Sequence, residues 1–164
     1  MPVTAPRRRA LSLRGAALVL LLALTAGGVA ARLAAQEGWR LAGLDGGALA
    51  AGDVAHGATV MVVFAGWSPH CREIVAKSNA LVDRFGGRAR VVLVDFQEEP
   101  GEVRGFLQGK GARAAVYLDA DGSFAKDHHV ATLPGLVVFK DGAVAFAGRL
   151  PDDAERAVGD ALGN

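Results

Sequence analysis

Cysteine is almost missing from this sequence: among its 164 residues, Cys71 is the single one. No disulfide can therefore form within one chain, and the thiol is either buried and inert or used between molecules. Internal repeats are also missing. The length and a hydrophobic content of 51% suit one folded domain, and they exclude both a disordered chain and one that is wholly embedded in a membrane.

Acidic residues are absent from the first 35 positions, which contain five arginines, at positions 7, 8, 9, 14 and 32. All 17 acidic residues lie in the remainder, where they outnumber the basic ones, although the whole chain has a formal charge of +1. The positive charge thus belongs to the leader. The body has no charge-based reason to bind nucleic acid, and no nucleic-acid partner is expected.

The leader has the pattern of an export signal. Residues 1–14 are basic, and residues 15–31 form an uncharged, mainly apolar run of 17 residues, which is at the short end of what spans a bilayer. We predict a transmembrane signal-anchor or a signal peptide over 15–35, a linker over 36–40 and a folded domain over 41–164. The domain is then held at the bacterial inner membrane, facing the periplasm or the outside, or released there after cleavage near residues 28–30. No cysteine follows the run, which excludes a lipoprotein anchor.

Strand and helix patterns alternate along the body. Apolar runs predict strands at residues 39–44, 59–64, 90–96, 114–118 and 136–139, with a hairpin partner at 143–147. Helical spacing predicts helices at 69–85, 101–110 and 152–162, and residues 124–129 are expected to form a short helix or a loop. In the first helix, Ser68 is expected to be the N-cap and Pro69 the first helical residue. The pattern predicts an α/β fold with a mixed central sheet that is flanked by helices.

Four features of the body resemble the thioredoxin superfamily, and within it the membrane-anchored TlpA/ResA-like branch. They are the strand that ends in Phe64-Ala65-Gly66-Trp67 before a four-residue segment at a helix start, the proline in Thr132-Leu133-Pro134, the hairpin at residues 138–142, and an extra strand and turn at 114–122. The resemblance implies a thioredoxin-like fold and thiol–disulfide exchange with exported proteins, in cytochrome c maturation or redox homeostasis. It also implies that Pro134 is a cis-proline facing the site, where Trp67, Leu133 and Pro134 bind substrate.

The resemblance is incomplete at the expected catalytic residues. The family has Trp-Cys-x-x-Cys, whereas this chain has Trp67 followed by Ser68-Pro69-His70-Cys71. Ser68 thus replaces the nucleophilic cysteine, and serine cannot form a disulfide. The strand position at which many relatives have a buried acid is occupied by Val62, which is consistent with a lost dithiol cycle. The remaining thiol, Cys71, can make a mixed disulfide but cannot resolve it within the chain.

Three functions remain open from the sequence. The first is a thiol–disulfide oxidoreductase-like protein that uses one cysteine, with an external thiol or a membrane redox partner completing each turnover. The second is a non-catalytic module that binds an extended peptide in the groove at Pro134. The third is a thiol peroxidase, because Ser68 and Cys71 also fit a Ser-x-x-Cys pattern. Against it, Phe64 stands where that pattern has a proline, and no arginine is dedicated to the site, with Arg72 and Arg149 as the two that could approach it.

Cofactors and metals are not expected from the sequence. His70 is expected to be an exposed bystander rather than a group that tunes the thiol. His128 and His129 are adjacent, and this spacing does not suit joint coordination of a metal with Cys71, so both are expected at the surface.

Overall fold

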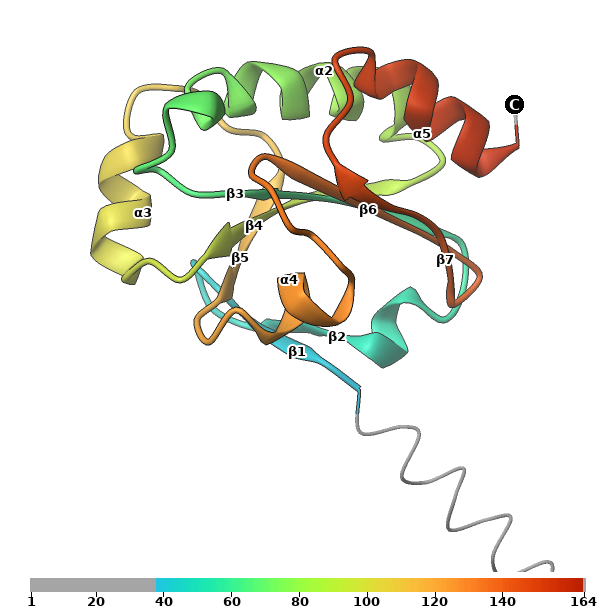
Figure 1. Cartoon of the computed structure of the whole chain (residues 1–164), viewed down its shortest axis with the longest axis horizontal. Coiled ribbons are helices and arrows are strands. Elements are labelled where there is room, and N and C mark those ends of the chain that lie inside the picture. The colour runs from blue at the N-terminus through green and yellow to red at the C-terminus, as the bar shows by residue number, and fades with distance from the viewer. Residues whose placement is uncertain (1–37, 164) are drawn as a thin grey trace, which may run out of the picture. The chain divides into compact units, whose positions relative to one another are not determined.

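The computed structural model describes residues 38–163 (Figure 1). In chain order its elements are β1 (Arg40–Gly43), β2 (Ala48–Ala50), the 3-10 helix η1 (Ala51–Val54), β3 (Ala58–Phe64), the 3-10 helix η2 (Pro69–Cys71), α2 (Ile74–Phe85), β4 (Arg90–Phe96), α3 (Pro100–Leu107), β5 (Ala115–Asp119), α4 (Ser123–Asp127), β6 (Gly135–Lys140), β7 (Ala143–Arg149) and α5 (Ala154–Leu162). Together, the seven strands form one sheet in the order β2-β1-β5-β4-β3-β6-β7. β3, β4 and β5 are parallel, whereas the other pairs are antiparallel. The predicted mixed sheet is confirmed.

β3 lies inside the sheet, between β4 and β6. Its residues from Val60 to Phe64 are completely buried, with alternate side chains on opposite faces of the sheet. A strand that is covered on both faces needs a continuous apolar run rather than an alternation of apolar and polar residues, and the run at 60–64 meets this condition. β3 is therefore a rigid support for the loop that follows Phe64.

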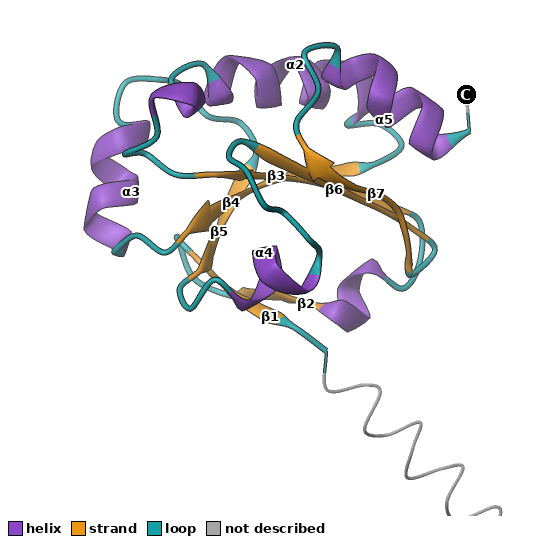
Figure 2. Ribbon diagram, viewed as in Figure 1, coloured by secondary structure: helices purple, strands orange, loops and turns teal. Residues whose placement is uncertain are grey.

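Helices cover both faces of the sheet, as Figures 1 and 2 show. On one face, α2, α3 and α5 bury apolar side chains such as Phe85, Val103 and Val158 against β3, β4 and β6. On the other face, α4 and η1 contribute Phe124 and Val54. Each face thus has its own apolar cluster, and burial of both clusters is the main force that stabilises the domain.

The predicted helix over residues 69–85 is two helices in the structure. η2 comprises Pro69–Cys71, and α2 begins only at Ile74. The apolar side chains of Cys71, Ile74 and Phe85 in this segment are all buried. The helix predicted from residue 152 begins at Ala154, and its N-cap is Asp153, whose side chain accepts a hydrogen bond from the Arg156 N–H at 3.0 Å.

None of the helices in residues 38–163 is long and apolar enough to cross a membrane. The predicted signal-anchor at 15–35 lies outside the described residues, as do the basic segment at 1–14 and the start of the predicted linker. These domain boundaries therefore stay predictions.

We predict that Leu93→Ala lowers the free energy of unfolding by about 3 kcal/mol, because Leu93 is completely buried in β4 and the truncation leaves a cavity. Urea titration followed by circular dichroism measures this loss. Val144→Ala is the control, since Val144 is 50% exposed on β7 and its truncation should change stability by less than about 0.5 kcal/mol. Equal losses in the two variants would contradict the burial of the sheet.

Candidate functional site

The candidate site lies where β3 ends and the chain turns into η2. The Ser68 N–H donates to the Ala65 carbonyl at 3.2 Å, and the Cys71 N–H donates to the Ser68 carbonyl at 3.0 Å. These two consecutive turns place Ser68 and Cys71 three residues apart on one short helical turn, as the sequence predicted. Ser68 is 5% exposed and Cys71 is completely buried.

The expectation that the Ser68 side chain caps a helix is wrong. Ser68 does occupy the N-cap position with an extended backbone, and Pro69 is in the first turn, but the serine side chain makes no capping hydrogen bond. The physical reason is the 3-10 geometry. A side chain at the N-cap would accept a hydrogen bond from the Cys71 N–H, but this N–H is already bonded to the Ser68 carbonyl.

Cys71 is a free cysteine within the apolar cluster that includes Phe64, Ile74 and Leu136. Its side chain has no exposed area. A disulfide or an alkylating reagent can reach the sulfur only when the η2 turn opens. The thiol is therefore shielded in this conformation.

Trp67 and its neighbours form the exposed part of the site. Trp67 is 66% exposed, and the only other exposed large apolar side chain among residues 38–163 is Val144, at 50%. Pro69 and His70 are also exposed, so the prediction for His70 is confirmed as to its exposure. A large exposed aromatic ring beside a turn is a feature typical of a contact surface.

The loop before β6 brings Leu133 and Pro134 to the same place. The Leu133–Pro134 peptide bond is cis, as the resemblance implied. Trp67, Ser68, Thr132 and Leu133 line a cavity of about 250 Å³ together with residues 96, 130 and 131. Of the predicted site residues, Trp67, Ser68 and Leu133 thus surround one hollow, whereas Pro69, His70, Cys71 and Pro134 do not line it.

The main chain at this cavity is available for pairing. Among the described residues, no donor or acceptor is hydrogen-bonded to the main chain of Thr132 or Leu133, and the first bonded group beyond them is the Pro134 carbonyl, which accepts from the Leu150 N–H at 2.9 Å. Main-chain groups without partners at a surface can bind an extended segment by β-pairing.

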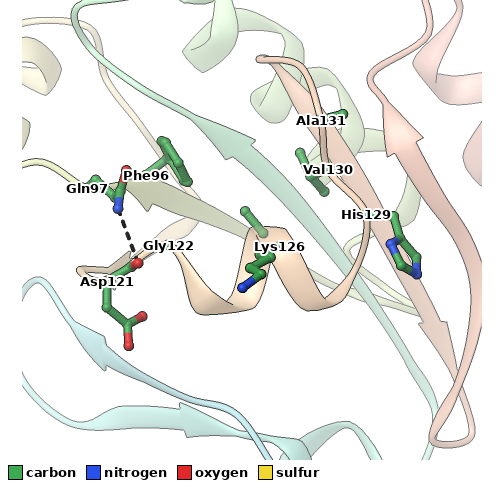
Figure 3. A pocket seen from close by; sticks show the side chains of 9 residues that line it. Phe96, Gln97, Asp121, Gly122, Lys126, His129, Val130 and Ala131 are labelled. Atoms are coloured by element: carbon green, nitrogen blue, oxygen red, sulfur yellow. Dashed lines mark hydrogen bonds between the residues drawn. The ribbon is translucent and has the colours of Figure 1, made fainter.

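A second hollow, of about 530 Å³, adjoins the first and shares Phe96, Val130 and Ala131 with it. Figure 3 shows it between the end of β4, the start of α4 and the loop after α4. Gln97 and His129, which both line it, have left-handed backbones, with φ of 61° and 56°. Such conformations are unfavourable for residues other than glycine and are concentrated at functional sites. Sequence reasoning missed this hollow, because its walls come from distant segments.

The prediction that both adjacent histidines are surface residues is wrong for His128. His129 is exposed, but His128 is half-buried, its Nδ1 lies 2.8 Å from the Phe124 carbonyl, and its ring packs against Trp39, Phe124 and Phe139. His128 therefore belongs to the core of the α4 side. Over residues 38–163, no group of three or more histidine, cysteine or acidic side chains is placed to hold a metal ion.

A buried carboxyl group lies next to the site, on a strand where no acid was expected. Val62 is completely buried on β3. Asp95, on β4, is also completely buried, and it pairs in register with Phe64 at the end of β3. Burial and, secondly, the neighbouring Glu98 carboxyl raise the pKa of Asp95 to about 8. Asp95 therefore holds a proton at neutral pH. The only sequence signal was a charged residue inside the apolar run at 90–96.

A second buried carboxylate, Asp119 at the end of β5, has a structural role. Its two oxygens accept from the N–H groups of Phe124 and Ala125 at 3.0 and 2.9 Å, which fixes the start of α4. Burial raises the pKa of Asp119, and these two hydrogen bonds act in the opposite direction. Gly122, in the turn before α4, has a left-handed φ of 72°, and a Cβ at this position would lie 2.9 Å from Phe96, so the position requires glycine.

The fold is shared with solved structures, although no protein-family model matches the sequence and no curated protein matches it. A thioredoxin-like protein from Aeropyrum pernix is 19% identical, with a TM-score of 0.64 over 84% of this chain and 97% of that one. A thiol:disulfide interchange protein of the thioredoxin family from Chlorobium tepidum is 19% identical, with a TM-score of 0.62 over 77% and 94%. A secreted disulfide oxidoreductase from Mycobacterium tuberculosis is 18% identical, with a TM-score of 0.61 over 77% and 96%.

The chain therefore has a thioredoxin-like fold, and its structural neighbours include thiol:disulfide interchange proteins, some of them exported. Identities as low as these establish the fold and leave function to the site itself.

We predict that the stability of the wild-type protein falls relative to Asp95→Asn as the pH rises from about 4 to about 8. The folded state binds the Asp95 proton up to a pKa of about 8, whereas the unfolded chain releases it near the ordinary pKa of 3.8, so each pH unit in this window costs the wild type at most about 1.4 kcal/mol. Above pH 8 the difference should be constant. Urea unfolding at several pH values measures it, and Asp152→Asn, at an exposed carboxyl, is the control. A difference that is independent of pH would contradict the prediction.

We also predict that iodoacetamide alkylates Cys71 in the native protein at least about tenfold more slowly than in urea, because the sulfur is reached only by local opening. Mass spectrometry of quenched samples gives both rates. Similar rates in the two conditions would show that the thiol is accessible in the native state.

Proposed function

We propose that this chain is an exported thioredoxin-like protein that binds an extended, cysteine-containing segment of another exported protein and forms a mixed disulfide with it through Cys71. The observation that carries the proposal is the meeting of Trp67, Ser68 and the unpaired main chain of Thr132 and Leu133 around one cavity, directly beside the turn that holds Cys71. The resemblance to thioredoxin-like proteins implies that the same surface contacts substrates.

Electron balance limits the chemistry that one thiol can perform. The Cys71 thiolate attacks one sulfur of a partner disulfide, a Cys71–partner disulfide forms, and the other partner sulfur leaves as a thiolate. Ser68 cannot then attack the mixed disulfide, so a second thiol from the same partner or from a membrane redox protein must release Cys71. The chain can thus trap a thiol protein or exchange its disulfides, but it cannot by itself accept or supply an electron pair.

The leader supports the cellular location. A basic segment at 1–14 and an apolar run inside 15–35 favour a membrane anchor or a signal peptide, either of which places the domain outside the cytoplasm. Exported protein thiols and disulfides are then the substrate class. The TlpA/ResA-like resemblance further suggests apocytochrome c maturation or redox homeostasis as the setting, and this part of the proposal rests on the resemblance alone.

Non-covalent binding is the second candidate function, and the complete burial of Cys71 favours it. In this case the segment occupies the 250 Å³ cavity and the adjoining 530 Å³ hollow, and the thiol only fills space in the core. The peroxidase alternative has less support, because peroxide would have to reach the same buried sulfur, and because Arg149 is exposed, with Asp152 4.0 Å away.

A single probe separates these functions. We predict that a synthetic extended peptide, with its one cysteine activated as a disulfide to 5-thio-2-nitrobenzoate, releases one coloured thiolate per wild-type chain and remains attached to Cys71. Absorbance and mass spectrometry measure the two products. Ser68→Cys should go one step further, because the introduced thiol attacks the mixed disulfide, frees the reduced peptide and leaves an internal disulfide between the introduced cysteine and Cys71.

Cys71→Ala is the matched control and should release no coloured thiolate. If the wild type also releases none while the peptide still changes the fluorescence of Trp67, the covalent proposal is wrong and the non-covalent one holds. Absence of both signals would overturn the assignment of this surface as a binding site.

A further inference from the structure

Two carboxyl groups meet beneath the turn formed by Gly66 and Trp67. Glu98, which follows β4, donates its N–H to Asp95 Oδ2 at 3.1 Å, and the Glu98 side-chain oxygen Oε2 accepts the N–H of Gly66. The Glu98 carboxyl group also raises the pKa of Asp95, through a side-chain hydrogen bond and through its charge. No donor among residues 38–163 is bonded to Asp95 Oδ1, which is completely buried. A proton shared by the two carboxyl groups would give this oxygen a partner.

The groups around this pair do not neutralise a second negative charge. From α3, the Glu102 carboxylate faces Asp95 and repels it. On the β3 side lies Phe64, and on the β5 side Asp95 pairs with Leu118, so neither neighbouring strand supplies a charge. On the α3 side, Arg104 is paired with Asp45, and Lys110, 3.3 Å from the centroid of the Phe106 ring, forms no ion pair with either carboxyl group. Two carboxylates in this environment therefore keep one proton between them.

Gly66 fits closely onto Glu98. A Cβ at position 66 would lie 3.0 Å from the Phe106 side chain and 3.1 Å from Glu98 Oε1. The main chain of Gly66 thus rests directly on these two side chains, and the next residue is Trp67, with its exposed ring. Any displacement of the Glu98 carboxyl group removes the hydrogen-bond partner of this turn.

We propose that a proton shared by Asp95 and Glu98 fixes the Gly66–Trp67 turn, and that both acids are positioning residues for the exposed ring of Trp67. Protonated Asp95 donates its O–H to the Glu98 carboxylate, which in turn accepts the Gly66 N–H. When the proton leaves, the two carboxylates repel each other, Glu98 moves toward water, and the turn is released. Weaker partner binding at alkaline pH would follow, and only this last consequence rests on the proposed function.

Carbon-detected NMR of the full chain in detergent micelles tests the proposal without any partner. We expect the Asp95 carboxyl carbon and the Gly66 carbonyl carbon to titrate together, with one midpoint close to the pKa of about 8. In Asp95→Asn the amide donates to Glu98 at every pH, so the Gly66 titration should vanish. Asp119→Asn is the matched control, because it changes a buried acid of the next strand that does not contact Gly66, and it should retain the Gly66 titration.

A Gly66 carbon that does not move between pH 5 and pH 10 would overturn the proposal, as would a titration that persists in Asp95→Asn. Glu98→Gln provides a second variant if Asp95→Asn does not fold. Removal of the neighbouring negative charge should lower the Asp95 midpoint below that of the wild type, and an unchanged midpoint would also overturn the shared proton. No partner is present in this titration, so its result does not depend on the proposed mixed disulfide, and the peptide assay tests that function separately.

Discussion

The parallel pairing of β3 with β4 is the constraint on which the candidate site depends. Both strands are buried on two faces, so their register is fixed, and Phe64 lies opposite Asp95 where the strands end. Because the carboxyl ends of parallel strands meet at one edge of a sheet, the turn after β3 and the acids after β4 come together there. The hydrogen bond from the Gly66 N–H to Glu98 joins the two segments.

This edge holds one thiol and no second cysteine. Ser68 is 5% exposed at the start of the η2 turn, and Cys71 is enclosed by the apolar cluster under that turn. The same edge has an exposed Trp67, the unpaired main chain at Thr132 and Leu133, and two adjoining hollows. In the proposed function, these groups would bind the partner, whereas disulfide exchange would depend on Cys71 alone.

The carboxyl pair is an unusual element of this edge, since burial of a charge without a cation is costly. Protonation of Asp95 avoids most of the free-energy cost of burying a charge, and it makes the Asp95 side chain a hydrogen-bond donor. Asp119, one strand away, shows the other solution: it accepts two main-chain N–H groups and needs no second acid. The two residues demonstrate that equal burial leads to different roles, depending on which donors the neighbouring segment supplies.

Local composition and spacing were enough to predict most of the strands and helices, including the apolar strand at 59–64 and the helical pattern at 69–85. The sequence also indicated the cis-proline through a resemblance. Three other features could be found only from the folded arrangement: η2 is separate from α2, the half-buried His128 packs against aromatic side chains, and Glu98, beside Asp95, accepts the Gly66 N–H. These features arise from contacts between segments about 30 or more residues apart or from competition for one N–H donor, and neither leaves a periodic pattern in the sequence.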